Sequence, residues 1–235
     1  MYMNIFEGIK VVLWDIDGTV FDFFEAQKNA IRTLFKQFNL GECDDEMLMD
    51  YDSINHKYWK ALERGEITKP QVLTGRFIEF FGKYNMDVSI VEAFNDEYQV
   101  RLGDTVSFFP GVLDTINMLK AAGILQCAVT NGTKIAQQKK LSQSGLDQIL
   151  DGIFISEDVG FEKPNPRFFE AVYDMITKER GEVNLSEIMI VGDSLSSDIK
   201  FGNNVGIKTC WFNHAGEANS NLRVDYEIDN FIHNV

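Results

Sequence analysis

The chain has 235 residues, of which 45% are hydrophobic, and a formal net charge of −14 at pH 7. This length suits one large domain or a core with a smaller domain, and the composition is that of a globular protein rather than a disordered one. Because nucleic acids and anionic membranes repel an acidic protein, the charge disfavours both as partners.

The first predicted element is a buried strand that begins at Val11 and leads into Asp15-Ile16-Asp17-Gly18-Thr19. The run is β-branched and aromatic and ends at a turn signal, which favours a strand of a parallel sheet. Ligands of open α/β sheets bind just beyond such strand ends. Asp15 and Asp17 point to the same side of the strand, and a cation relieves their repulsion. Carboxylate oxygens suit a hard divalent ion, most simply Mg²⁺.

Residues 21–105 show only helical patterns. Apolar residues recur at helix spacing in four segments, at 30–38, 47–62, 70–80 and 91–102. Thr68 is placed to cap the third of these helices, with Pro70 in its first turn. Four short helices in sequence predict a small bundle, which we expect to be an insertion after the first strand.

From residue 106 onward, predicted helices and strands alternate. Strands are expected at 124–130, 152–156, 187–191 and 208–213, with a short edge strand at 226–228. Helices are expected at 112–119, 134–144, 166–178 and 197–204. Such alternation predicts βαβ units and a mostly parallel, Rossmann-like sheet. The fold class is therefore α/β, with residues 1–20 and 106–235 forming the core and residues 21–105 forming an inserted four-helix bundle.

Polar residues occur just after a predicted strand at four places: Asp15, Asp17 and Thr19; Thr130-Asn131-Gly132; Lys163; and Asp193 with Asp198. In a parallel sheet these strand ends lie side by side, so the groups can meet in one crevice. Each motif alone has a plainer explanation. Asn131-Gly132 is a turn pair, Lys163 fits a surface lysine, and Asp193 fits a helix cap. Their combination and order support a shared site.

These four motifs, in this order and each at a strand end, resemble the four motifs of the haloacid dehalogenase (HAD) superfamily, most of whose members are phosphatases. The helical insertion resembles the first cap type of that superfamily. The resemblance spans the whole chain and implies a HAD-like core with a helical cap. It also implies phosphoryl transfer through an aspartyl-phosphate. The dehalogenase branch is disfavoured, because its members lack the second acid, which is Asp17 here.

The resemblance implies catalytic and metal-binding roles for the matching acids. Asp15 would be the nucleophile and Asp17 the general acid and base. Mg²⁺ would be held by Asp15, the Asp17 backbone carbonyl and Asp193. Asp198 would orient a water ligand of the metal, or Lys163, without binding the metal itself.

The resemblance also implies a phosphate-binding set. The phosphoryl oxygens would be held by the side chains of Thr130 and Lys163 and by the backbone N–H groups of Gly18 and Asn131. Thr130 and Lys163 thereby complete the expected catalytic set with the two acids of the first motif. These groups would supply the local positive charge that an acidic protein needs in order to bind phosphate.

Two segments, 51–81 and 130–169, resemble one branch in particular, the noncanonical pyrimidine 5′-nucleotidases. The resemblance implies hydrolysis of nucleoside 5′-monophosphates, a small-molecule phosphate monoester class, with preference for deoxy and uracil or thymine types. One alternative is a generic small-molecule or sugar-phosphate phosphatase, or a phosphomutase, of the same superfamily. A second, from another class, is a non-catalytic phosphate-binding protein on the same fold.

Aromatic residues lie near the joints between the core and the insertion: Phe21, Phe23, Phe24 and Phe108. They either stack on a base or pack the insertion onto the core. Arg76 either contacts the substrate from the insertion or lies on a helix face. The sequence leaves both pairs of alternatives open.

The cysteines Cys43, Cys127 and Cys210 lie far apart and form no C-x-x-C pair, which favours a reduced setting. The N-terminus shows no apolar segment followed by a cleavage site, because Asp15 interrupts the candidate run. No stretch is long and apolar enough to span a bilayer. We therefore expect a cytoplasmic protein without a membrane partner.

Overall fold

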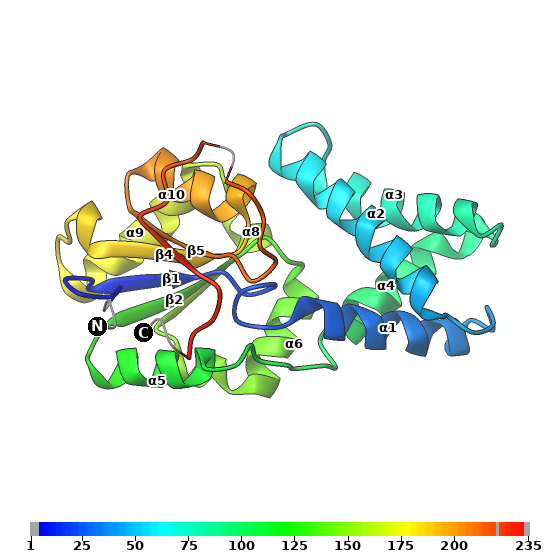
Figure 1. The fold of residues 1–235 in the computed structure, drawn as a ribbon, viewed down its shortest axis with the longest axis horizontal. Helices are drawn as coiled ribbons and strands as arrows, with labels where there is room; N and C mark the ends of the chain where they lie inside the picture. The colour runs from blue at the N-terminus through cyan, green and yellow to red at the C-terminus, as the bar shows by residue number, and fades with distance from the viewer. Residues whose placement is uncertain (1–4, 220, 233–235) are drawn as a thin grey trace.

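The computed structural model describes residues 5–219 and 221–232. Within this described part, six strands form one sheet of order β3-β2-β1-β4-β5-β6 (Figure 1). Neighbouring strands pair in parallel. The strands are β1 Val11–Trp14, β2 Leu125–Thr130, β3 Gly152–Ile155, β4 Ile188–Gly192, β5 Lys208–Phe212 and β6 Tyr226–Ile228. The predicted α/β class with a Rossmann-like sheet is confirmed, and the short edge strand is present.

Strand β1 lies in the centre of the sheet. It pairs with β2 on one side and β4 on the other, so Leu13 lies between Cys127 and Ile190. Because successive side chains of a strand point to opposite faces, Leu13 joins one apolar layer and Trp14 joins the other. A strand buried on both faces needs apolar residues at every position, which explains the uninterrupted run that precedes Asp15.

Helices cover both faces of this sheet (Figure 1). One face carries α5 Val112–Ala121 and α6 Lys134–Ser144, and the other carries α9 Arg167–Arg180 and α10 Lys200–Val205. Shorter helical segments connect the main elements: η1 Val88–Ile90, α7 Leu146–Ile149, α8 Ser156–Val159 and η2 Leu185–Glu187. Within the described residues, no helix combines the length and the apolar character that crossing a membrane requires.

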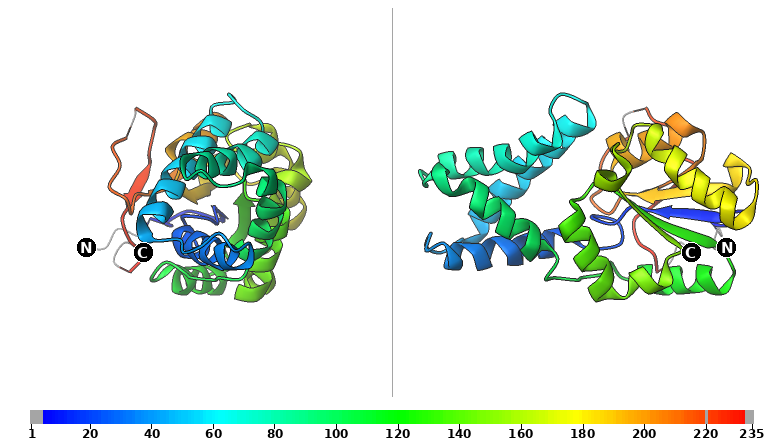
Figure 2. Two further views of the ribbon diagram at one scale, coloured as in Figure 1. Left: turned by 90° about the vertical axis from the view of Figure 1, so that its right-hand side faces the viewer. Right: turned by 180° about the vertical axis from the view of Figure 1, so that it is seen from behind.

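Residues 23–102 form a separate layer of helices beyond the carboxyl ends of the strands, and we call it the helical unit. It contains α1 Phe23–Gln37, α2 Asp45–Glu63, α3 Lys69–Lys83 and α4 Val91–Leu102. An apolar cluster of its own, rich in aromatic rings, holds these helices together: Phe35, Tyr51, Phe77, Phe80, Phe81, Phe94 and Tyr98. Figure 2 shows from behind that the C-terminal end of α2 approaches the core. Two other parts of the unit also contact the core: Lys69 at the start of α3 donates to Gly132 and Ser156, and α4 packs on α6.

The two chain segments that connect the helical unit to the sheet run side by side. The backbone N–H of Asp22 donates to the Ser107 carbonyl at 2.8 Å, and that of Phe109 donates to the Val20 carbonyl at 3.1 Å. One short double connection therefore joins the unit to the core at the edge of the strand-end face.

The helix predicted at 197–204 is wrong in its first turn. A π-helical segment, η3 Leu195–Ile199, precedes α10. The Asp198 carboxylate accepts a hydrogen bond of 3.1 Å from the Ser194 backbone, which turns the side chain back toward the end of β4. A Cβ at Gly192 would lie 2.4 Å from an Asp198 carboxylate oxygen, so glycine alone leaves room for this arrangement. Turns of this kind often occur at functional sites.

Candidate active site

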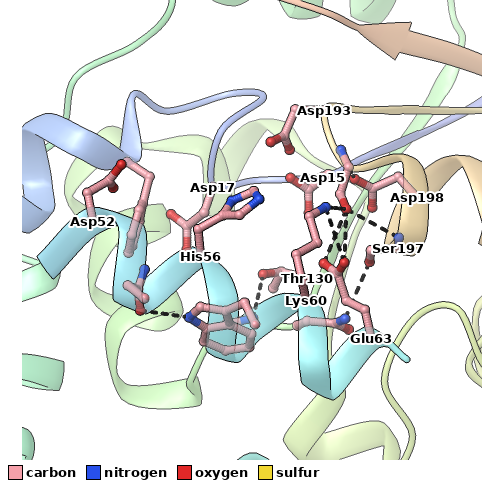
Figure 3. A pocket seen from close by; sticks show the side chains of 16 residues that line it. Asp15, Asp17, Asp52, His56, Lys60, Glu63, Thr130, Asp193, Ser197 and Asp198 are labelled. Atoms are coloured by element: carbon pink, nitrogen blue, oxygen red, sulfur yellow. Dashed lines mark hydrogen bonds and ion pairs between the residues drawn. The ribbon is translucent and has the colours of Figure 1, made fainter. Parts of the chain in front are cut away.

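Three acids of the described chain meet beyond the carboxyl ends of β1 and β4. Asp15 directly follows β1, Asp193 directly follows β4, and Asp198 lies in η3. One carboxylate oxygen from each of the three lies within 4.8 Å of the other two. Figure 3 shows these side chains gathered on one side of the site, with Asp17 on the other side of Asp15. The predicted meeting of acids from distant parts of the sequence is therefore present in the fold.

Lys163 is buried among these acids. Its ammonium group donates to an Asp15 carboxylate oxygen at 2.8 Å, to an Asp198 carboxylate oxygen at 2.7 Å and to the Val129 carbonyl at 2.6 Å. Three donors thus meet three acceptors, which satisfies a buried ammonium. Lys163 positions Asp15 and Asp198 relative to each other.

The backbone of Lys163 is in turn held by Asn131. The Lys163 N–H donates to the Asn131 side-chain oxygen at 2.8 Å, and the Asn131 amide nitrogen donates to the Lys163 carbonyl at 2.8 Å. The side-chain amide therefore mimics a neighbouring strand. This pairing connects the loop after β2 to the loop after α8 and fixes where the lysine enters the site.

The site has an excess of negative charge. Burial and the nearby Asp198 carboxylate raise the pKa of Asp15 to about 7, although Lys163 opposes this effect. Desolvation and the Asp15 carboxylate raise the pKa of Asp193 well above its usual range. Burial acts to lower the pKa of Lys163, but the facing carboxylates of Asp15 and Asp198 raise it above its ordinary value. One lysine therefore does not neutralise three clustered acids.

This donor set fits a hard divalent cation. Carboxylate oxygens are the ligands that Mg²⁺ prefers, and Asp15 and Asp193 present theirs from adjacent strand ends. The raised pKa values of both groups show how poorly the protein alone neutralises them. Asp198 accepts from Lys163 through one oxygen and from the Ser194 backbone N–H through the other, which suits the indirect role predicted for it better than direct metal ligation.

Gly18 allows the loop after β1 to lie against Asp193. Its φ is +91°, and a Cβ there would lie 2.6 Å from an Asp193 carboxylate oxygen. The next residue, Thr19, places its hydroxyl 3.1 Å from an Asp15 oxygen and 3.2 Å from an Asp193 oxygen. The hydroxyl has one proton, so it donates to one of these acids at a time. Through the Thr19 hydroxyl, the loop after β1 thereby contacts both Asp15 and Asp193.

The expected phosphate contact from the Gly18 backbone is not available in this structure. The Gly18 N–H donates to the Phe21 carbonyl at 2.9 Å, because the chain turns back on itself immediately after the strand. Thr130 is buried at the end of β2, where its hydroxyl accepts a hydrogen bond of 3.0 Å from the Gly132 N–H. Lys163 lies beside Asp15, as described above.

The Asp17 side chain turns away from the other acids and toward α6. One carboxylate oxygen accepts a hydrogen bond of 2.6 Å from the Gln137 amide, and the other forms an ion pair with Lys140. Neither α6 residue was predicted for the site. Their spacing of three residues, which places both on one face of the helix that follows Thr130, is the signal that could have identified them.

A cavity of about 200 Å³ lies between the acids and α2 (Figure 3). Strand-end residues form its floor: Asp15, Asp17, Thr130, Asn131, Gly132, Asp193, Ser194, Ser197 and Asp198. The helical unit forms the opposite wall with Phe23, Asp52, Asn55, His56, Trp59, Lys60 and Glu63. Six of these seven residues lie on α2, so one helix shapes most of the wall that faces the acids.

The end of α2 also contacts the loop that holds the acids of β4. The Lys60 ammonium donates to the hydroxyls of Ser194 at 2.8 Å and Ser196 at 3.0 Å. The Glu63 carboxylate accepts from the same hydroxyls, at 3.2 Å and 2.5 Å. These polar contacts close the cavity at one end, and sequence patterns alone did not indicate them.

Arg76 occupies neither of the two positions considered for it. It is buried inside the helical unit, where it donates to the side-chain oxygens of Asn55 at 2.7 Å and Asn95 at 3.4 Å. Its guanidinium also lies over the Phe77 and Tyr98 rings, at 5.0 and 5.1 Å from their centroids. Phe77 belongs to α3, but Asn55 comes from α2, and Asn95 and Tyr98 come from α4, so the pattern within α3 does not reveal this environment.

The phenylalanines near the joints divide between the two predicted roles. Phe23 lines the cavity, whereas Phe21 is buried and packs on Phe108 with ring centroids 4.9 Å apart. Phe24 and Phe108 are not among the residues that line the cavity. Phe23 is therefore the member of the group whose position fits contact with a ligand.

The parallel sheet, covered by helices on both faces and carrying its polar groups at the strand ends, places the chain in the Rossmann-like α/β class. Residues 12–212 match the haloacid dehalogenase-like hydrolases. The chain belongs to this family.

The chain is similar over most of its length to three proteins of known sequence and to one crystal structure. The chain is 35% identical to the HAD-hydrolase YfnB of Bacillus subtilis over 206 residues, which are 87% of this chain and 84% of that protein. It is 33% identical to the pyrimidine 5′-nucleotidase PynA of Streptococcus pneumoniae over 223 residues, covering 93% and 90%. It is 28% identical to the pyrimidine 5′-nucleotidase YjjG of Escherichia coli over 202 residues, covering 86% and 85%. A crystal structure of YfnB bound to magnesium superposes with a TM-score of 0.85, at 31% identity, over 95% of each chain.

Proposed function

We propose that this protein is a Mg²⁺-dependent phosphatase that works through an aspartyl-phosphate. The observation on which this depends is the position of Asp15, which Lys163 orients at the floor of a cavity beside Asp193. A carboxylate fixed at a strand end, next to a cation site and open to a cavity, has the geometry of an in-line nucleophile.

The proposed reaction has two steps. In the first, an Asp15 carboxylate oxygen bonds to phosphorus, the bond from phosphorus to the ester oxygen breaks, and Asp17 gives its proton to that leaving oxygen. In the second, Asp17 takes a proton from a water molecule whose oxygen bonds to phosphorus. The bond between Asp15 and phosphorus then breaks, which releases inorganic phosphate and restores both acids.

Asp15, the Asp17 backbone carbonyl and Asp193 are the proposed Mg²⁺ ligands, with Asp198 acting through Lys163 or a water molecule. When bound, the ion supplies positive charge for the phosphoryl oxygens and for the crowded acids. The magnesium bound in the structure of the similar protein YfnB supports this choice of metal. Thr130 and the Asn131 backbone, which line the cavity, are proposed to hold the phosphoryl oxygens. Lys163 is proposed to join them when the phosphoryl group replaces one of the three acceptors that engage its ammonium, Asp15, Asp198 and the Val129 carbonyl.

The proposed substrate is a nucleoside 5′-monophosphate with a pyrimidine base. The similarity to PynA and YjjG supports this class. The wall of the cavity supports it physically, because Phe23 and Trp59 offer aromatic surfaces on which a base can stack. Trp59 is held in place by its 3.1 Å hydrogen bond to Asn55, whose oxygen also accepts from Arg76.

We propose further that residues 21–105 form a cap and that residues 1–20 and 106–235 form the core. The paired segments around Asp22 and Ser107 would act as the joint about which the cap opens to admit substrate. Closure would restore the contacts of Lys60 and Glu63 with the β4 loop and exclude water from the phosphoryl group. The interdomain movement described for YfnB supports such a motion.

The deciding experiment is a screen of phosphate release with Mg²⁺ across pyrimidine and purine nucleoside monophosphates and sugar phosphates. We expect the highest kcat/KM for pyrimidine nucleotides and a loss on the order of 10³-fold or more in Asp15→Asn. Higher kcat/KM for sugar phosphates would identify a generic sugar phosphatase instead. No release from any monoester, including p-nitrophenyl phosphate, would point to the non-catalytic binding protein.

A further inference from the structure

We propose that Lys140 and Gln137 of α6 are positioning residues that hold the Asp17 carboxylate for its acid–base work. This inference rests on the proposed function, and it assigns a task to two residues outside the four family motifs. Neither residue lines the cavity, so both act through Asp17 and do not touch the substrate.

The Lys140 side chain is 0% exposed, and its ammonium pairs with one Asp17 oxygen. The adjacent Leu141 and nearby Ala136 are also buried, but in apolar clusters, as expected for a helix packed against other elements. An apolar residue at 140 would avoid the cost of burying an ammonium group. Packing alone therefore does not explain the Lys140 ammonium, whose ion-pair partner is Asp17.

Gln137 holds the other Asp17 oxygen from one helical turn earlier. Its amide nitrogen lies 2.6 Å from that oxygen, and its side chain is 1% exposed. A Cβ at Gly132 would lie 2.2 Å from the same nitrogen, so the glycine after Thr130-Asn131 makes room for this contact. Gly132 in the loop after β2 therefore leaves the space in which Gln137 of α6 reaches Asp17.

The Gln137 side-chain oxygen is buried and has no hydrogen-bond partner among the described residues. An amide next to a catalytic acid can donate through its nitrogen and accept through its oxygen. With this oxygen unengaged, the Gln137 side chain holds Asp17 through donation from its amide nitrogen.

Two acids separated by one residue are therefore served by different lysines. Lys163 donates to Asp15, and Lys140 donates to Asp17. The Phe23 ring, which comes from the helical unit, lies with its centroid 5.0 Å from the Lys140 ammonium and covers it from that side. Separate anchors keep the nucleophile and the acid in different orientations, even though both follow the same strand.

The test compares leaving groups in Lys140→Met and Gln137→Leu, which remove the donors with little change in size. With a nucleoside monophosphate, whose departing oxygen needs a proton, we expect kcat to fall about 10- to 100-fold, as misplacement of a catalytic group does. KM should stay near the wild-type value. With p-nitrophenyl phosphate, whose nitrophenolate leaves without a proton, the stopped-flow burst rate of both variants should stay near the wild-type rate. Lys140→Arg, which keeps the charge, should recover part of kcat for the nucleoside monophosphate.

Matched controls come from the same helix. Lys134→Met removes an equal charge from a partly exposed lysine that pairs with Asp158 at 2.6 Å, and Gln138→Leu changes the exposed neighbour of Gln137. Both controls should show wild-type kinetics. Gln137→Leu leaves the buried ion pair intact, so it tests the inference even where Lys140→Met does not fold.

Wild-type kcat in both test variants would overturn the inference. So would equal slowing of nucleotide turnover and of the nitrophenolate burst, because a general structural loss does not distinguish leaving groups. Failure of the proposed function gives a different result, since the wild-type protein would then release no phosphate from any of these substrates.

Discussion

Gly18 lies so close to Asp193 that a Cβ at position 18 would stand 2.6 Å from a carboxylate oxygen of that acid. The contact joins the loop after β1 to the loop after β4, the two loops that carry the proposed metal ligands. Any side chain at position 18 must therefore displace either the loop or Asp193.

We predict that Gly18→Ala weakens Mg²⁺ binding and lowers kcat, because the new methyl group pushes Asp193 away from Asp15. The φ of +91° adds strain for alanine, which by itself costs about 1 kcal/mol or more of folding free energy. Isothermal titration with Mg²⁺ and steady-state kinetics measure the two functional effects.

Gly41 supplies the matched control. Its φ is also +91°, but no described atom lies within 4 Å of a Cβ added there. Gly41→Ala should therefore show the loss of stability that comes from the positive φ alone, with normal Mg²⁺ binding. Similar Mg²⁺ affinities in the two variants would contradict the importance of the Gly18–Asp193 contact.

Removing the Lys163 ammonium should destabilise the protein strongly. In Lys163→Met, the buried Asp15 and Asp198 carboxylates lose the group that donates to both of them. Breaking a buried ion pair from one side typically costs about 3–5 kcal/mol. Urea unfolding in EDTA measures the loss, and added Mg²⁺ should recover part of it. Lys10→Met, which removes an exposed pair with Glu187, should cost about 1 kcal/mol or less, and equal losses in the two variants would contradict the prediction.

Mg²⁺ should bind more tightly as the pH rises through about 7. Burial and Asp198 raise the pKa of Asp15 to about 7, so the folded apo protein keeps a proton there that the unfolded chain releases near pH 3.8. The contribution of Asp15 to stability therefore falls as the pH rises from about 4 to 7, which is the opposite of an acid with a lowered pKa. A bound cation removes this loss by favouring the ionised carboxylate.

Thermal melts with and without Mg²⁺ at pH 5.5, 7 and 8.5 test this prediction. The increase in Tm caused by Mg²⁺ should grow with pH and level off above pH 7. Asp15→Asn should remove the part of the pH dependence that comes from Asp15 and leave the part that comes from Asp193, whose pKa is also raised by burial. An increase in Tm that is constant across this pH range would rule out proton release from Asp15 on metal binding.

The polar residues at the strand ends could be predicted because they follow apolar runs in the sequence. The apolar run before Asp15 predicts a buried strand. Asn131 and Asp193 also directly follow apolar runs, which end at Thr130 and at Gly192. Parallel strands place their carboxyl ends at one edge, so residues far apart in sequence come together without knowledge of side-chain packing. This is why Lys163 and Asp193 were predicted to share a site with Asp15, and the structure places them together.

The other contacts depend on packing between elements that sequence patterns place only coarsely. Lys140 resembles a surface lysine until α6 is placed against the loop after β1, where Asp17 becomes its partner. Arg76 resembles a helix-face charge until α2 and α4 surround it with amides and rings. The first turn after β4 is π-helical because Asp198 bonds back to a loop N–H, and periodicity in the sequence does not encode such a contact.

Recognition of the base should depend on Trp59. Its indole lines the cavity and is fixed by the 3.1 Å hydrogen bond to Asn55, so a stacking surface is already in place before substrate binds. Base–aromatic stacking is worth about 1–3 kcal/mol, so Trp59→Leu should raise KM for a pyrimidine nucleotide about 10-fold. Ribose 5-phosphate, which has the sugar and phosphate but no base, should keep its KM in the same variant.

Asn55→Leu should show a weaker form of the same pattern, because it frees the indole without removing it. Lys57→Leu, at an exposed position on the same helix, is the control and should leave both KM values unchanged. Steady-state kinetics with the two substrates give the ratio of KM for the pyrimidine nucleotide to KM for ribose 5-phosphate. A parallel rise in KM for the nucleotide and for ribose 5-phosphate in Trp59→Leu would mean that the indole shapes the cavity as a whole and does not contact the base.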